Sequence, residues 1–169
     1  MDHWLLRLLK HRRLDEADVN RALGVGALQR IEARVSASEQ RHSGEIRVCL
    51  EAGLPLSYLR REASARERAV TMFGKLRVWD TEHNNGVLIY LLLADHAIEI
   101  VADRGLARHV GAAQWQHITA TMSAAFQAGQ FEAGLNQAID AVDALLLQHF
   151  SLAAGAADSN ELPDAPVLR

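Results

Sequence analysis

Apolar residues follow two different periods along the chain, and the changes of period separate predicted strands from predicted helices. Ile46, Val48 and Leu50 alternate with polar or small residues, which is typical of a strand with one covered face. The continuous apolar run at residues 87–93 is typical of a central strand that is covered on both faces. Residues 98–102 are the third predicted strand, so the pattern indicates an α/β domain.

Apolar positions elsewhere recur at the spacing of a helix, with polar residues between them. Asp15 and Ser57 are residue types that cap helices, and both precede such a pattern. The charged side chains of the segment after Ser57, among them Arg68, are expected to form a solvated face. The predicted helical segments are residues 1–13, 28–42, 57–76, 115–126 and 131–145.

The connections between the strands determine how the sheet is built. The link at residues 94–97 is too short for a crossover, so the second and third strands form an antiparallel hairpin. A helical segment separates the first strand from the second, which predicts a parallel pair with a right-handed crossover. The sheet is therefore expected to be mixed.

This topology brings two polar turns together at one edge of the sheet. If the hairpin is centred between Asp95 and His96, the numbers of paired residues add up to about 191, give or take two. The turn from Asp80 to Gly86 then faces the turn from Asp103 to Gly105. The first strand starts at the same edge, which places Glu45 nearby.

The turn residues allow two interpretations. Carboxylates, amides and backbone carbonyls are the ligands of hard cations, so Asp80, Asn85, Asp103 and Glu45 are candidate ligands of Ca²⁺ or Mg²⁺. The spacing is not that of an EF-hand, so such a site would combine separate segments. The other interpretation is that both are ordinary turns of the Asx-Gly type. His83 is expected to be exposed in either case.

Composition and charge exclude several classes of protein. The net charge of −3 and the pI of about 6.2 do not favour a nucleic-acid binder, which needs a basic excess. The one cysteine, Cys49, is expected to be a buried thiol in a strand. We find no apolar run long enough to span a membrane and no signal-peptide pattern, so the cytoplasm is the expected location.

The two ends of the chain differ from the middle. Residues 1–13 predict a short basic amphipathic helix, which suits docking to a membrane surface or, as the simpler hypothesis, packing on its own domain. The segment at 151–169 is small and polar and is expected to be disordered. The predicted organisation is a basic helical segment at 1–23, an α/β domain at 24–150 and a disordered tail at 151–169.

Three segments, at residues 43–48, 76–89 and 98–105, resemble the TPM domain family, which includes thylakoid-lumen and photosystem II repair proteins. The resemblance covers residues 25–150 and continues through Trp115, Phe126, Gly129, Gly134, Ala138 and Ile139. It implies a three-layer α/β/α sandwich with a small mixed sheet. It also implies weak acid phosphatase activity in some members, Ca²⁺ or other divalent-cation binding in some, and no settled function in many bacterial ones.

The resemblance transfers a polar motif to this chain by position, and the match at Glu45 is weaker than the others. Many relatives carry a signal peptide and a membrane helix. We expect neither here, so the chain resembles a soluble bacterial-type member. The residues that match the motif are Asp80, Asn85, Gly86, Asp103, Arg104 and Gly105.

Two functional hypotheses follow. In the first, the domain is a non-catalytic or weakly catalytic module that binds a cation, a protein partner or a membrane-associated complex through the turn edge. In the second, it is a metal-dependent acid phosphatase, with the metal at Asp80 and Asp103 and the phosphate at Arg104. The sequence contains no P-loop and no nucleophile elbow, which favours the first hypothesis.

Overall fold

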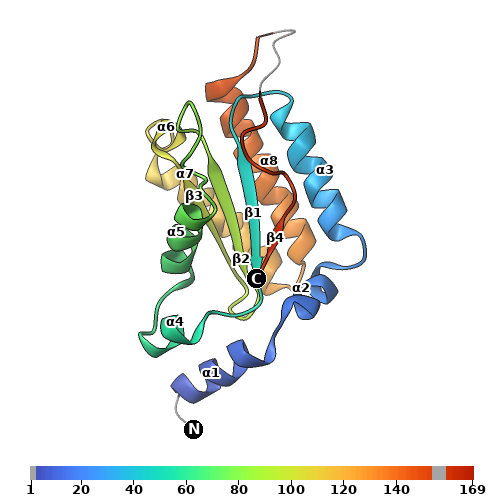
Figure 1. Cartoon of the computed structure of the whole chain (residues 1–169), viewed down its shortest axis with the longest axis vertical. Helices are drawn as coiled ribbons and strands as arrows, with labels where there is room; N and C mark the ends of the chain where they lie inside the picture. Colours follow the sequence, from blue (N-terminus) through green and yellow to red (C-terminus); the bar gives the residue numbers. More distant parts are fainter. Residues whose placement is uncertain (1–2, 154–158) are drawn as a thin grey trace.

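The computed structural model describes residues 3–153 and 159–169, which contain a four-stranded mixed sheet in the order β3-β2-β1-β4 (Figure 1). β1 (Ile46–Glu51) pairs in parallel with β2 (Val87–Leu92), and β2 pairs antiparallel with β3 (Ala97–Ala102). β4 (Val167–Leu168) lies parallel to β1 on its other side. The predicted parallel pair and antiparallel hairpin are therefore confirmed.

Helices cover both faces of the sheet and produce the three layers. One face, with Val48 and Ile89, packs against α2, α3, α7 and α8. The opposite face, with Leu88 and Tyr90, packs against α4 and α5. The α/β/α sandwich is confirmed. The helices are α1 (His3–Arg13), α2 (Glu16–Leu23), α3 (Ala27–Glu39), α4 (Leu56–Arg60), α5 (Ala65–Lys75), α6 (Arg104–Ala107), α7 (Ala112–Gln127) and α8 (Phe131–Phe150).

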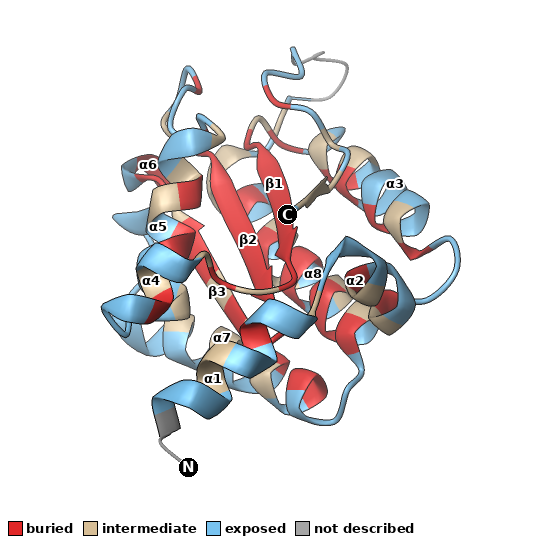
Figure 2. Cartoon of the chain, turned by 60° about the horizontal axis from the view of Figure 1, so that its bottom comes forward, coloured by how far each residue is buried: buried red, intermediate tan, exposed pale blue. Residues whose placement is uncertain are grey.

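β1 is buried along its whole length, so the prediction of a strand with one covered face was wrong (Figure 2). The polar side chains Arg47 and Glu51 alternate with the apolar ones, yet both are buried. Each has a dedicated partner: Glu51 pairs with Arg68 of α5, and Arg47 donates to backbone carbonyls of the C-terminal segment. An alternating pattern therefore coexists with burial because the polar side chains are satisfied internally.

The predicted helix over residues 57–76 is two helices, and Ser57 does not cap it. The backbone of Glu62, with φ of 53°, turns left-handed and separates α4 from α5. Ser64 caps α5 instead, since its hydroxyl accepts the N–H of Glu67 at 3.1 Å. Arg68 is buried, so the expectation that it lies on a solvated face was also wrong.

The N-terminal helix α1 packs on the domain, as the simpler hypothesis expected. The His11 side chain is buried, and its Nδ1 accepts the N–H of Leu54 at 3.0 Å. Its other ring nitrogen lies 3.0 Å from a carboxylate oxygen of Asp95, in the β2–β3 link. Arg7 adds a hydrogen bond to the carbonyl of Ala63. The predicted cap of the next helix, Asp15, is confirmed by a capping box.

The C-terminal segment is not disordered where the structure describes it. Residues 159–169 run beside β1 and end in β4, where the N–H of Arg169 donates to the carbonyl of Leu50 at 2.9 Å. Leu162 is buried in the core on the α5 side. The prediction of disorder rested on the polar composition of this segment. The contacts with β1 and with the core order the segment despite that composition. Residues 154–158 of the predicted tail lie outside the described part of the chain.

None of the helices formed by the described residues has the length and apolar character that crossing a membrane requires.

Candidate functional site

The two polar turns meet at the edge of the sheet where β1 and β2 begin. The N–H of Asp103 donates to the carbonyl of Gly86 at 2.9 Å, and the N–H of Gly105 donates to that of Asn84 at 2.7 Å. Val87 pairs with Ala102, so the numbers of paired residues add up to 189, which is within the predicted range of 191 give or take two. The hairpin argument therefore located the correct pair of turns.

The two glycines of the motif have a steric role. A Cβ atom on Gly86 would lie 2.0 Å from the carbonyl oxygen of Val78. A Cβ atom on Gly105 would lie 2.3 Å from the carbonyl oxygen of Asn84. Only glycine allows the backbones to approach so closely. These positions are explained by the meeting of the turns and need no ligand.

Asn85 is buried in the first turn and holds it to the start of β1. Its Nδ2 donates to the carbonyl oxygen of Ser43 at 2.9 Å, and its backbone N–H donates to the hydroxyl of Thr81 at 3.1 Å. Its Oδ1 is also buried but has no hydrogen-bond partner among the described residues. A buried acceptor without a donor is costly, so this oxygen has acceptor capacity that a ligand or water could satisfy.

Asp103 is buried in the second turn and shows the same feature. Its Oδ1 accepts the N–H of Arg104 at 2.7 Å, at the start of the one-turn helix α6. Its Oδ2 is buried and unpartnered within the described residues. Each of the two turns that meet therefore carries one buried side-chain oxygen with free acceptor capacity.

The other two candidate ligands have different surroundings. Asp80 is half-exposed, and its carboxylate lies 3.6 Å from Nε of Arg77. Glu45 is buried, and its two oxygens accept the N–H groups of Glu161 and Leu162 at 3.1 and 3.0 Å. Within residues 3–153 and 159–169, no three His, Cys, Asp or Glu side chains are grouped so that they could hold a metal ion.

The candidate phosphate ligand Arg104 is largely exposed, with its Nε 3.9 Å from Oδ1 of Asp103. The guanidinium therefore faces solvent at the rim of the edge and is open to an anion. His83 is exposed, as expected.

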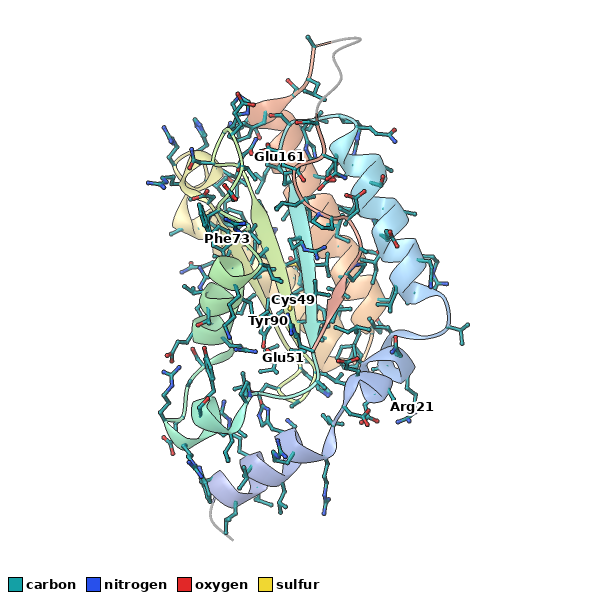
Figure 3. All side chains as sticks on the ribbon, viewed as in Figure 1. Arg21, Cys49, Glu51, Phe73, Tyr90 and Glu161 are labelled. Carbon is teal, nitrogen blue, oxygen red and sulfur yellow. The ribbon has the colours of Figure 1, made fainter. Side chains whose placement is uncertain are left out.

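Sequence reasoning missed the contribution of the C-terminal segment to this edge. The Glu161 carboxylate accepts the N–H of Glu82 in the first turn at 3.0 Å, while the Glu161 backbone binds Glu45 (Figure 3). The segment thus links the first turn to the start of β1. The signals for it in the sequence are Leu162, an apolar residue inside a polar stretch, and the apolar pair Val167 and Leu168.

A serine, a histidine and an aspartate meet between α3 and α8, but their geometry is not that of a catalytic triad. The Ser38 hydroxyl donates to Asp143 at 2.6 Å. Nε2 of His42 lies 2.9 Å from the same hydroxyl and 3.4 Å from the Asp143 carboxylate, so serine and acid share one ring nitrogen. In a triad the acid holds the other nitrogen. Burial lowers the pKa of His42, consistent with a neutral ring in a helix–helix joint.

The single thiol offers no nucleophile either. Cys49 is buried in β1, as predicted, and burial raises the pKa of its thiol to about 12. A thiol with such a pKa is almost entirely protonated at neutral pH and reacts slowly.

Comparisons with known proteins agree with this architecture. Residues 17–145 match the model of the TPM domain. The NMR structure of the BA42 protein from Bizionia argentinensis aligns with a TM-score of 0.73 and 27% identity, over 86% of this chain and 94% of that one. The N-terminal domain of a P. gingivalis protein aligns at 0.61 and 19% identity, over 78% and 82%, which concerns the fold alone. No curated protein matches the chain.

Proposed function

Because the chain belongs to the TPM domain family, we propose that it is a binding module whose turn edge takes a divalent cation, Ca²⁺ or Mg²⁺. The observation that carries the proposal is the pair of buried, unpartnered oxygens, Oδ1 of Asn85 and Oδ2 of Asp103. They lie on two turns that the backbone joins directly. An amide and a carboxylate oxygen are hard ligands of the kind that these cations prefer.

The proposed ligand set is smaller than the one suggested by the sequence. Glu45 is engaged by two backbone donors, and Asp80 faces Arg77 at the surface. Asp103 is then the only carboxylate, and water and backbone carbonyls complete the shell. A site with one formal negative charge binds weakly, so we expect a dissociation constant on the order of 10⁻⁴ to 10⁻³ M.

An NMR titration with CaCl₂ and with MgCl₂ tests this function. We expect amide shifts that are confined to residues 81–86 and 103–105 and that saturate in the millimolar range. Asp103→Asn keeps an oxygen for the cap of α6 but removes the charge, and it should abolish the shifts. Asp80→Asn is the matched control and should leave them unchanged. Shifts that persist in Asp103→Asn, or that spread over the acidic surface, would refute the site.

The exposed guanidinium of Arg104 beside Asp103 supports a second candidate, the acid phosphatase. In this hypothesis Arg104 binds the phosphate and Asp103 holds the metal, which would supply Lewis-acid stabilisation of the transferred group. The described residues provide no activated serine or cysteine beside them. Hydrolysis of p-nitrophenyl phosphate by the unaltered chain, lost in Arg104→Ala, would support catalysis, and equal background rates would refute it.

The remaining expectations concern the binding partners of the protein and its location in the cell. A protein partner or a membrane-associated complex at the edge and a cytoplasmic location stay predictions. The acidic net charge supports the further expectation that nucleic acid is not a ligand.

A further inference from the structure

One side of helix α1, its inner face, packs against the domain. Arg7, Leu8 and His11 make its contacts with the domain: Leu8 packs on the core beside α5, and the other two bind Ala63, Leu54 and Asp95. These residues recur at helical spacing and so occupy one side of the helix. Leu5, Leu6 and Leu9 lie on the opposite side, and they are not among the residues of either hydrophobic core cluster.

The outer face of α1 is apolar and uncovered. Leu5, Leu6 and Leu9 are 40%, 48% and 45% exposed. Single exposed leucines are normal on a protein surface, but here three lie within two turns of one short helix. A hollow bordered by Leu6 and Leu9 continues this surface towards Leu14.

Basic residues flank the exposed leucines on both sides. With roughly 100° between successive residues, the three leucines form one arc, with Arg12 at one border, Lys10 at the other and Arg13 in line with the arc one turn later. All three cations are exposed, and α1 contains no acidic residue. Cations in the last turn also favour the helix dipole, but that role does not account for the leucines.

The position of α1 in the molecule leaves this face accessible. The helix lies at the lower end of the long axis, outside the sandwich, and its outer side is exposed (Figures 1 and 2). It also lies outside the matched TPM domain, which begins at residue 17. The helix is thus an addition to the domain, docked by specific hydrogen bonds with its apolar side outwards.

We propose that the outer face of α1 binds the surface of an anionic membrane. The leucines enter the boundary between headgroups and acyl chains, and Lys10, Arg12 and Arg13 contact lipid phosphates. The charge pattern argues for this occupant, since the apolar arc is bordered by cations on both sides and α1 itself contains no acidic residue. This proposal is independent of the cation site, because the turn edge lies at the opposite end of the molecule (Figure 1).

Co-sedimentation of the full chain with large unilamellar vesicles tests the proposal. We expect binding to vesicles of phosphatidylcholine with 30% phosphatidylserine at 0.1 M salt, weakening as salt rises, and no binding to phosphatidylcholine alone. The triple variant Leu5→Ser/Leu6→Ser/Leu9→Ser should bind at least about tenfold more weakly. Its inner-face contacts are untouched, so its thermal unfolding should match that of the unaltered chain.

Two matched controls distinguish binding through the outer face of α1 from nonspecific hydrophobic adsorption and from an effect of net charge. Val70→Ser/Leu147→Ser removes exposed apolar side chains elsewhere and should not change vesicle binding. Lys10→Gln/Arg12→Gln/Arg13→Gln should weaken binding about tenfold or more, whereas Arg60→Gln/Lys75→Gln/Arg108→Gln, with the same loss of charge, should have little effect.

Four results would overturn the proposal. The first is no binding to anionic vesicles at 0.05 M salt, and the second is equal binding to neutral and anionic vesicles. The third is vesicle binding that the leucine variant retains. The fourth is a concentration-dependent dimer in analytical ultracentrifugation that the leucine variant abolishes, without vesicle binding, which would show that a second copy covers the face.

Discussion

At the scale of single residues, the most consequential contact is a buried ion pair between β1 and α5. Arg68 donates from Nε and Nη2 to the two oxygens of Glu51, at 2.8 and 2.6 Å, and the Tyr90 hydroxyl donates to the same carboxylate at 2.6 Å (Figure 3). The pair explains how β1 tolerates a carboxylate inside the sandwich. Such pairs contribute little net stability when intact, but removing one partner leaves a charge without compensation.

We therefore expect Arg68→Met to lower the free energy of unfolding by about 3–5 kcal/mol, measured by urea denaturation with circular dichroism. The double variant Glu51→Gln/Arg68→Met should recover a large part of the loss, because no buried charge remains. Arg61→Met, at an exposed pair with Glu67, is the control and should not change the denaturation midpoint. If Arg68→Met behaves like Arg61→Met, Glu51 is not isolated from water.

Glu39, next to the C-terminal segment, gives the protein a predictable pH dependence. Burial raises the pKa of Glu39 to about 9. The hydrogen bond from the Ile46 N–H lowers this pKa, but the effect of burial is larger. The folded state then holds one more proton than the unfolded state between about pH 4.5 and 9. Stability is highest below that window and falls as pH rises through it, by up to about 1.4 kcal/mol per pH unit.

Glu39→Gln keeps an acceptor for the Ile46 N–H and cannot ionise. We expect it to flatten the dependence of unfolding free energy on pH between 5 and 9 and to be more stable than the unaltered chain at pH 8.5. Urea midpoints measured across this range provide the check, with Glu32→Gln, on the exposed side of the same helix, as control. An unchanged slope in Glu39→Gln would mean that another group titrates.

At the scale of elements, the C-terminal segment closes an edge of the sheet that would otherwise be open. The N–H of Ala52 donates to the carbonyl of Arg169 at 2.9 Å, and Leu162 fills a place in the core. Deleting residues 159–169 should lower stability by at least about 1.5–3 kcal/mol through the lost burial of Leu162, and further because Arg47 and Glu45 lose their backbone partners. It should also accelerate hydrogen exchange at Ala52 while Ile89, in the centre of the sheet, stays protected relative to global unfolding. Unchanged exchange at Ala52 would show that β4 does not pair stably.

The elements that could be predicted from the sequence are those determined by a pattern of neighbouring residues. The run at residues 87–93 and the short link after it fixed the hairpin, and the hairpin located the turn edge. The burial of Arg68 and the order of the C-terminal segment depend on partners far away in the chain, Glu51 and Glu45, which no local pattern identifies.

The candidate site was predictable to the same extent. The meeting of the turns followed from topology, and both orphan oxygens belong to residues that the motif named. The engagement of Glu45 by backbone donors was not predictable, because it requires a segment whose composition indicates disorder.

At the scale of the whole molecule, the two proposed surfaces lie at opposite ends of the long axis, with α1 at one end and the turn edge beside α6 at the other (Figure 1). A chain docked through α1 would hold the edge away from the membrane and open to a soluble ligand. The only natural thiol, on Cys49, is buried and has a raised pKa, so an introduced cysteine can be labelled selectively.

We therefore expect fluorescent labels at Leu9→Cys and Arg104→Cys to respond differently to anionic vesicles. Iodide quenching of the label at position 9 should fall strongly on binding, because that side chain enters the interface. Quenching at position 104 should stay as in free solution, because the edge points into water. Neutral vesicles are the control and should change neither. Protection of both labels would mean that the domain lies on its side, and protection of position 104 alone would place the membrane at the turn edge instead.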